Sequence, residues 1–208
     1  MLAVASDLML RGRSISDGQP TASLAFEFAA RPGVYGGVEL VGTWPRGASA
    51  RFLGVVAQLG FARPIGPALA VEAGITQRAY SQAYTPGFAA DFVELYGGLS
   101  RGAVAARIAW SPDYFGRGAQ TLYLEAETAQ PLGPATRATL RGGVLAVMVP
   151  PAPPAQLRAR WDVRTGIGHD LGRLTLEAAI HAVGPTPDPL RDGTERRVTA
   201  TLGARLAF

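Results

Sequence analysis

Apolar and polar residues alternate along most of this chain with a period of two. In the C-terminal stretch RRVTATLGARLAF, one face takes the apolar residues Val198, Ala200, Leu202, Ala204, Leu206 and Phe208. The other face takes Arg197, Thr199, Thr201, Gly203 and Arg205. A helix, whose side chains repeat every ~3.6 residues, does not produce this division. The pattern therefore predicts β-strands with one apolar face and one polar face.

The same template fits about twelve segments of about 9–13 residues, the length that a tilted strand needs to cross a bilayer. The expected strands are residues 2–11, 20–30, 34–43, 51–62, 68–79, 91–100, 103–112, 120–130, 136–148, 156–167, 173–183 and 195–208. The connections after even-numbered strands are short, as in RPG and PLGPA, whereas those after odd-numbered strands are longer, as in YSQAYTPGFAA. This rhythm is typical of transmembrane barrels with short periplasmic turns and longer extracellular loops.

A soluble β-sandwich also alternates apolar and polar residues, but it gives no reason for the connection lengths to alternate. Trp110 and Trp161, near the long connections, and Phe28, Phe61 and Phe208, near the short turns, fit the two aromatic girdles of a membrane barrel. An open sheet edge in lipid would leave backbone groups unpaired, at several kcal/mol for each group. We therefore predict an all-β fold, a closed antiparallel transmembrane β-barrel of about twelve strands, with residues 1–208 as a single outer-membrane domain.

The N-terminal stretch SDLMLRGRSISDGQP changes from an alternating pattern to a polar, glycine-containing run. The first strand is expected to point Leu2, Val4, Leu8 and Leu10 toward lipid, and Asp7 and Arg11 inward. Gly12 then ends the strand, and SISDGQP forms the first outer loop, with Asp17 and Gly18 as a turn pair.

Composition narrows the classes of partner and compartment. Only 17% of the residues are charged, below the ~25% of soluble domains. The net charge is +4, but the arginines are spread over the strands, so we expect no nucleic-acid partner. The absence of cysteine excludes disulfides and thiolate chemistry, and no apolar run is long enough for a transmembrane helix. MLAVA lacks the features of a signal peptide, so we expect a mature chain in the bacterial outer membrane.

Several motifs resemble those of one known family. SDLMLRGRSISDGQPTASLAFEF, followed by GVYGGVEL, is similar to the start of the TorF family of proteobacterial outer-membrane porins, and ELYGGLS, WSPDYFG and LEAETAQPLG are similar to its later motifs. Leu8 departs from the aromatic residue usual in that family. The resemblance implies a porin-like protein of the outer membrane.

The alternation places nearly every charged residue of the strands on the inner face. The acidic residues expected to line a pore are Glu27, Glu39, Glu72, Glu94, Glu125, Glu127 and Glu177. The basic residues and the histidine expected there are Arg107, Arg137, Arg141, Arg158, Arg160, Arg164, Arg197, Arg205 and His181. Since consecutive strands are neighbours in such a barrel, the two signs should occupy different arcs of the wall. The resulting transverse field would orient small polar or charged solutes diffusing through a porin-like channel.

Two other functions stay open. The inner charges could pair across the lumen and plug it, which would leave a structural or partner-binding barrel without transport. Many inner positions are small, and this favours an open lumen: Ala5, Ala25, Gly37, Gly54, Gly60, Gly74, Gly98, Ala105, Gly143 and Gly203. The second alternative is a lipid-modifying enzyme, which needs a Ser–His or His-based site facing the bilayer.

The histidines do not fit such an enzyme, because His181 falls on the inner face and His169 in an expected short turn. The chain also lacks a G-x-S-x-G motif. We therefore expect no enzymatic activity, no catalytic residues, no metal site and no cofactor. The expected partners are membrane lipid, lipopolysaccharide and small solutes. A partner protein or a homo-oligomer is left open.

Overall fold

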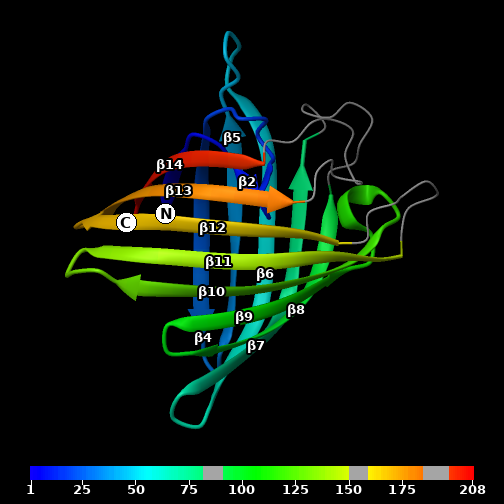
Figure 1. Ribbon diagram of the computed structural model, residues 1–208, viewed down its shortest axis with the longest axis vertical. Helices are drawn as coiled ribbons and strands as arrows, with labels where there is room; N and C mark the ends of the chain where they lie inside the picture. Colours follow the sequence, from blue (N-terminus) through cyan, green and yellow to red (C-terminus); the bar gives the residue numbers. More distant parts are fainter. Residues whose placement is uncertain (82–90, 150–158, 185–196) are drawn as a thin grey trace.

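The computed structural model describes residues 1–81, 91–149, 159–184 and 197–208. Within these ranges, twelve antiparallel strands form a closed barrel in the order β1-β14-β13-β12-β11-β10-β9-β8-β7-β6-β5-β4. Figure 1 shows β10–β13 crossing in front of β4–β6, as expected for the two opposite walls of a barrel with tilted strands. The expected fold class is confirmed.

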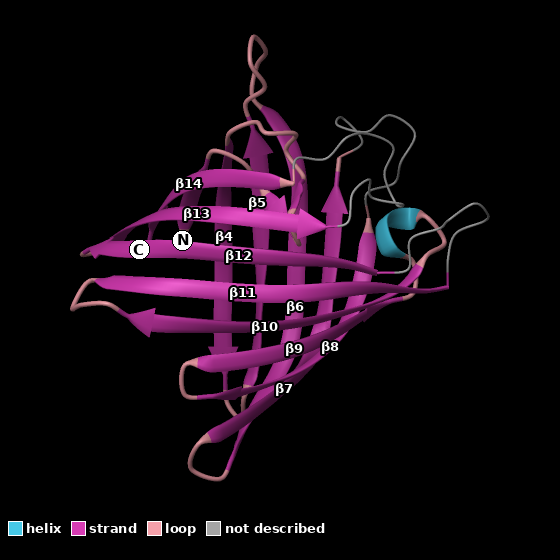
Figure 2. Cartoon of the chain, viewed as in Figure 1, coloured by secondary structure: helices cyan, strands magenta, loops and turns pink. Residues whose placement is uncertain are grey.

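The wall strands are β1 (Leu2–Ala5), β4 (Thr21–Ala30), β5 (Val34–Thr43), β6 (Arg51–Ile65), β7 (Leu69–Tyr80), β8 (Phe92–Arg101), β9 (Val104–Ser111), β10 (Gln120–Pro131), β11 (Thr136–Val149), β12 (Ala159–Leu171), β13 (Leu174–Gly184) and β14 (Val198–Leu206). Three short elements, β2 (Met9–Leu10), β3 (Arg13–Ser14) and the 3-10 helix η2 (Tyr114–Gly116), lie outside the wall ladder. Figure 2 shows that strands dominate the described chain.

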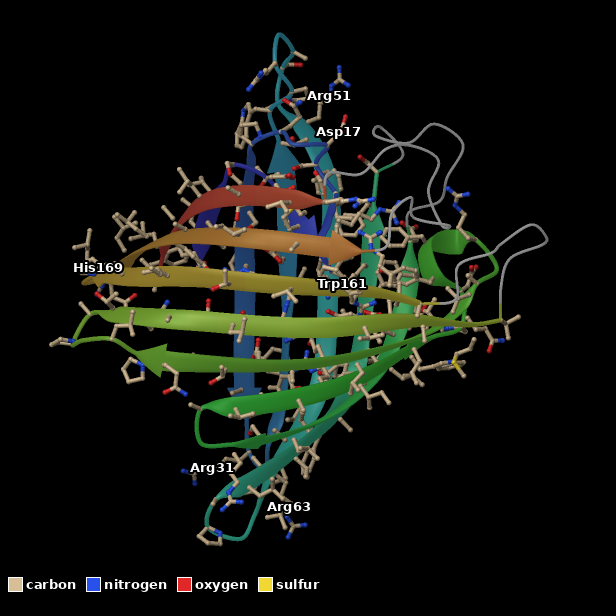
Figure 3. All side chains as sticks on the ribbon, viewed as in Figure 1. Asp17, Arg31, Arg51, Arg63, Trp161 and His169 are labelled. Atoms are coloured by element: carbon tan, nitrogen blue, oxygen red, sulfur yellow. The ribbon has the colours of Figure 1, made fainter. Side chains whose placement is uncertain are left out.

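The connections have the expected alternation in length. Five short turns join successive strands at one end of the barrel, at residues 31–33, 66–68, 102–103, 132–135 and 172–173. We call this the short-turn end and the opposite end the long-loop end. In Figure 3, Arg31 and Arg63 lie at the short-turn end, and Arg51 and Asp17 lie at the long-loop end.

The outer surface of the barrel is apolar, as the alternation predicts. Leu202 is 67% exposed and Ile180 is 51% exposed, although each lies in the middle of its strand. Trp110, Trp161 and Phe28 are also exposed on this surface. A ring of exposed aliphatic side chains is unfavourable in water but favourable against hydrocarbon. No helix of the described residues has the length and hydropathy needed to span a membrane.

The expected first strand is wrong beyond residue 5, whereas Asp7 and Arg11 are buried inside the barrel and Asp17 and Gly18 form a turn, as expected. The strand β1 ends at Ala5 instead of residue 11, and residues 7–19 fold back as a separate hairpin built on the pairs Met9–Ser14 and Leu10–Arg13. Leu8 and Leu10 do not point to lipid, because they pack against a buried cluster inside the barrel. The reason is that a tight turn at Arg11 and Gly12, both with positive φ, reverses the chain into the lumen.

Candidate functional site

The N-terminal hairpin, residues 7–19, is organised around Asp7. The Asp7 carboxylate accepts hydrogen bonds from Ser14 Oγ at 2.6 Å and from Ser16 Oγ at 2.8 Å. The backbone N–H of Leu8 donates to Ser16 Oγ at 3.0 Å, and that of Ile15 donates to the Leu8 carbonyl at 2.7 Å. These bonds give the Asp7 carboxylate and the hydroxyls of Ser14 and Ser16 partners within the hairpin, so these groups can lie in a partly apolar interior.

Arg11, at the tip of the hairpin, is buried against the opposite wall. Its Nη2 lies 2.6 Å from Oε1 of Glu94 on β8. Its guanidinium carbon lies 3.9 Å from the ring centre of Tyr123 on β10 and 5.6 Å from that of Tyr114 in η2, which are cation–π distances. Burial opposes the charged form of Arg11, but electrostatic interactions with Tyr114 and with the Glu94 carboxylate outweigh it and hold the pKa of Arg11 above its ordinary value. The tip therefore stays cationic.

An apolar cluster fills the lumen around this hairpin. Its buried members come from the wall and from η2: Val41, Leu53, Tyr80, Phe92, Tyr96, Ala109, Tyr114, Phe115, Ala119, Tyr123 and Leu145. Leu8, Leu10 and Ile15 of the hairpin pack against it. Phe92, Tyr114 and Phe115 contact one another with ring centres 4.6–4.8 Å apart. The long-loop half of the lumen is therefore packed like a protein core.

Below the hairpin the lumen opens into two adjoining polar cavities. The middle cavity has a volume of about 310 Å³, and Leu10 and Arg11 of the hairpin are part of its lining. The second cavity, toward the short turns, has a volume of about 590 Å³. Ala105, Glu127 and Arg141 line both cavities and mark their junction. Each volume lies within the range of small-molecule sites.

A hydrogen-bonded network stiffens the wall of the middle cavity. Arg107 on β9 donates from Nε and Nη2 to Oε1 of Glu72 on β7, at 3.0 and 2.6 Å. Tyr35 on β5 donates to Oε2 of the same carboxylate at 2.6 Å, and its hydroxyl is 2.7 Å from that of Tyr96 on β8. The network joins four strands on the inner face, so these side chains are held in fixed positions.

Arginines dominate the cavity at the short-turn end. Its charged lining residues are Glu127, Arg137, Arg141, Arg164, Glu177 and Arg205. The Glu177 carboxylate pairs with both Arg164 and Arg205. Arg141 and Arg164 are direct register partners on β11 and β12, an arrangement that is unfavourable for like charges unless a counter-charge lies near.

Glu177→Gln is expected to lower the stability of the folded barrel, because it removes the carboxylate shared by two arginines. The side chains are partly exposed, so we expect a loss of about 1–2 kcal/mol, between the values for surface and buried pairs. The measurement is denaturant unfolding in lipid vesicles. Glu127→Gln is the matched control, since Glu127 lines the same cavity but forms no ion pair with a described residue. Equal losses in the two variants would contradict this role of Glu177.

Ten of the sixteen residues predicted to line a pore border these cavities. They are Glu72, Glu94, Arg107, Glu125, Glu127, Arg137, Arg141, Arg164, Glu177 and Arg205. Arg160 and His181 are buried nearer the long-loop end, while Glu27, Glu39 and Arg197 lie outside the two linings. Arg158 lies outside the described residues.

Arg78 and Arg11 also line the middle cavity but are missing from the sequence-based set. Arg78 is two residues beyond Thr76 and four beyond the inner-face residue Gly74, so the alternation of β7 could have identified it. Arg11 was expected to point inward, but its contact with Glu94 could not be predicted, because the two residues are far apart in the sequence.

The small inner residues do not simply widen the lumen, as the sequence suggested. A Cβ at Gly60 would lie 2.6 Å from Cζ of Tyr35, and one at Gly54 would lie 2.7 Å from Cδ1 of Tyr80. Gly74 is covered in the same way by the hydroxyl end of Tyr96. These glycines let tyrosine rings lie against the wall, so part of the space that they leave is filled.

The two histidines lie in different settings. His181 is buried on the inner face of β13, and its Nε2 is 3.0 Å from Oγ1 of Thr201. His169 was expected in a turn but belongs to β12, because this strand continues to Leu171. Its Nδ1 is 2.8 Å from Oγ1 of Thr136 on the adjacent strand.

The backbone of the chain resembles solved outer-membrane proteins. The NanC porin has a TM-score of 0.66 and 8% identity, with both chains covered completely. The KdgM porin has a TM-score of 0.63 and 8% identity, with 100% of this chain and 98% of that chain covered. Outer membrane phospholipase A from Escherichia coli has a TM-score of 0.51 and 10% identity, with 98% and 93% covered. At these identities the likeness shows a shared fold.

Sequence comparison gives the family. No curated protein matches the chain by sequence. The model of the Gcw_chp family, described as a bacterial protein of unknown function, matches residues 1–167. This match spans well over half of the chain, and the chain therefore belongs to the Gcw_chp family.

Proposed function

We propose that this protein is a porin-like channel of the bacterial outer membrane for small polar or charged solutes. The observation that carries the proposal is the pair of adjoining polar cavities, lined by arginine and glutamate, inside a closed barrel with an apolar exterior. A polar interior of this kind can pass solutes, whereas the apolar exterior requires lipid around it. The fold shared with the NanC and KdgM porins supports this function. The resemblance of SDLMLRGRSISDGQP to the TorF porins supports the same compartment.

The distribution of charge supports a preference for anions at the short-turn end. Arg137, Arg141, Arg164 and Arg205 border that cavity with two carboxylates, those of Glu127 and Glu177. Guanidinium groups match carboxylate oxygens in bidentate geometry. The KdgM porin has been described in complex with disordered oligogalacturonate, and we propose small anions as the preferred solutes of this chain.

Planar-bilayer recording tests both parts of the proposal. We expect single-channel currents, with a reversal potential in a potassium chloride gradient that indicates chloride as the more permeant ion. In the variant with Arg141→Glu and Arg164→Glu, the reversal potential should shift toward that of potassium, because two positive charges of the lining become negative. Arg63→Glu, at the exposed rim in Figure 3, should shift it much less. A folded protein that gives no current, both in the wild-type form and after removal of the N-terminal hairpin, would contradict the channel proposal.

A plugged barrel without transport is the second candidate function. The observation in its favour is the packed long-loop half, where the hairpin and the aromatic cluster meet. Such a protein would be silent in bilayers, and co-purification of a stoichiometric partner would support it. We propose no catalytic activity, since His181 is engaged with Thr201 inside the barrel.

A further inference from the structure

The N-terminal hairpin lies across the lumen between the two polar cavities and the long-loop end. We propose that residues 7–19 form a releasable plug, which decides whether small solutes pass the long-loop half of the barrel. This inference rests on the proposed channel function and adds the element that regulates it. It depends on three structural features: how the hairpin is bonded, how it contacts the wall, and what lies beneath it.

The hairpin has its own backbone ladder. Its strand pairs are Met9–Ser14 and Leu10–Arg13, and the further backbone bonds of residues 7–19 run from Ile15 to Leu8 and from Gln19 to Ser16. The wall strands, in contrast, bond to neighbours on both sides around the closed barrel. The hairpin can therefore leave the lumen as a unit without breaking a backbone hydrogen bond between wall strands.

Side chains hold the hairpin in place. Arg11 pairs with Glu94 and stacks on Tyr123, and Arg13 lies 4.5 Å from the ring centre of Phe115. Gly12 rests directly on the wall, since a Cβ there would lie 2.9 Å from Cβ of Val183. An ion pair and a few ring contacts therefore hold the hairpin against the wall. Such contacts can break and re-form more easily than the continuous backbone ladder between two wall strands.

The cavity beneath the hairpin has a polar lining. Leu10 and Arg11 line the middle cavity together with the polar residues Glu72, Thr76 and Arg78. Withdrawal of the hairpin would remove Leu8, Leu10 and Ile15 from the apolar cluster and join this cavity to the long-loop end. The released Arg11 side chain would gain water in place of Glu94 and Tyr123, whereas Asp7 would keep its partners Ser14 and Ser16 within the hairpin.

The first test removes the plug. Residues 8–18 are replaced by a short Gly/Ser linker, and conductance is measured in planar bilayers beside the wild-type protein. We expect a several-fold higher single-channel conductance, because the packed half of the lumen loses its central element. The matched control replaces residues 46–49 of the β5–β6 connection, at the same end, with the same linker and should leave conductance near the wild-type value.

The second test locks the plug, and the absence of cysteine in the wild-type chain makes it specific. Gly12→Cys with Val183→Cys places two thiols at the contact between hairpin and wall, where a small shift gives the Cβ separation of about 3.5–4.5 Å found in disulfides. We expect the oxidised barrel to conduct less than the same protein after reduction. Gly12→Cys alone controls for strain at this positive-φ residue and should not respond to reductant.

The outcomes separate the plug from the channel. If the plugless barrel and the locked barrel conduct as the wild-type protein does, the plug proposal fails and the channel proposal stands. If every variant is folded but silent, both proposals fail. If the plugless barrel conducts and the locked one is silent, the hairpin is the gate. Heat-modifiable mobility on SDS gels shows for each variant that the barrel has folded.

Discussion

Leu202→Arg is expected to destabilise the barrel in lipid by about 2–4 kcal/mol, the cost of a basic side chain near the bilayer midplane. Leu202 lies at the centre of β14 and is 67% exposed on the apolar exterior. The substituted side chain would meet hydrocarbon on the face where its neighbours Ala200 and Ala204 also point. The measurement is reversible unfolding in guanidinium chloride with the barrel inserted in phosphatidylcholine vesicles.

Thr201→Arg is the matched control, because Thr201 is adjacent in the same strand but faces the lumen and His181. The substituted arginine would reach the polar interior, and the hydrogen bond between Thr201 and His181 would be lost. We expect the free energy of unfolding to fall by about 1 kcal/mol. Equal destabilisation by both substitutions would contradict the assignment of the two faces. Stronger destabilisation at residue 201 would reverse it.

Glu94→Gln is expected to release the hairpin, the second large effect. Removing one partner of a buried ion pair costs about 3–5 kcal/mol, since the remaining charge is left without compensation. Arg11 is buried beside Glu94 but belongs to a hairpin that can move, so the charge can escape to water. We expect trypsin to cut the variant after Arg11 or Arg13 in detergent solution, with the short N-terminal fragments identified by mass spectrometry.

Two comparisons make this result specific. Glu125→Gln changes another carboxylate of the middle cavity, one without an ion pair to a described residue, and should leave the hairpin protected. Arg11→Gln combined with Glu94→Gln should restore part of the protection against cleavage after Arg13, because the buried charge of Arg11 is removed together with that of its partner. A hairpin that stays resistant in the single variant would show that the apolar contacts alone hold it.

The wall of the barrel could be predicted from the sequence because its signal is local. Each residue of β14 alternates between lipid and lumen, and one strand contains the whole pattern. Turns such as Arg101–Val104 are equally local, since two residues join the strands. The same alternation places ten charged residues on the inner face, and these ten residues line the two cavities.

The plug could not be predicted, because its interactions are not local. Leu8 and Leu10 continue the alternation of β1, so a longer first strand fits the pattern equally well. What distinguishes the two structures is the fit of Arg11 to Glu94 and Tyr123 on distant strands. The packing of tyrosine rings against Gly54 and Gly60 could not be predicted for the same reason, because the ring and the glycine belong to different strands.

The two ladders that join β1 to its neighbours are the shortest in the described part of the barrel wall. The ladder between β1 and β14 contains four residue pairs, from Leu2–Leu206 to Ala5–Gly203, and the ladder between β1 and β4 also contains four. The ladder between β10 and β11, in contrast, contains twelve. Closure of the cylinder thus depends on the pairing of β1 with β14. Assembly of the barrel is complete only when β14 has paired with β1. Strain on the wall should separate these two strands first.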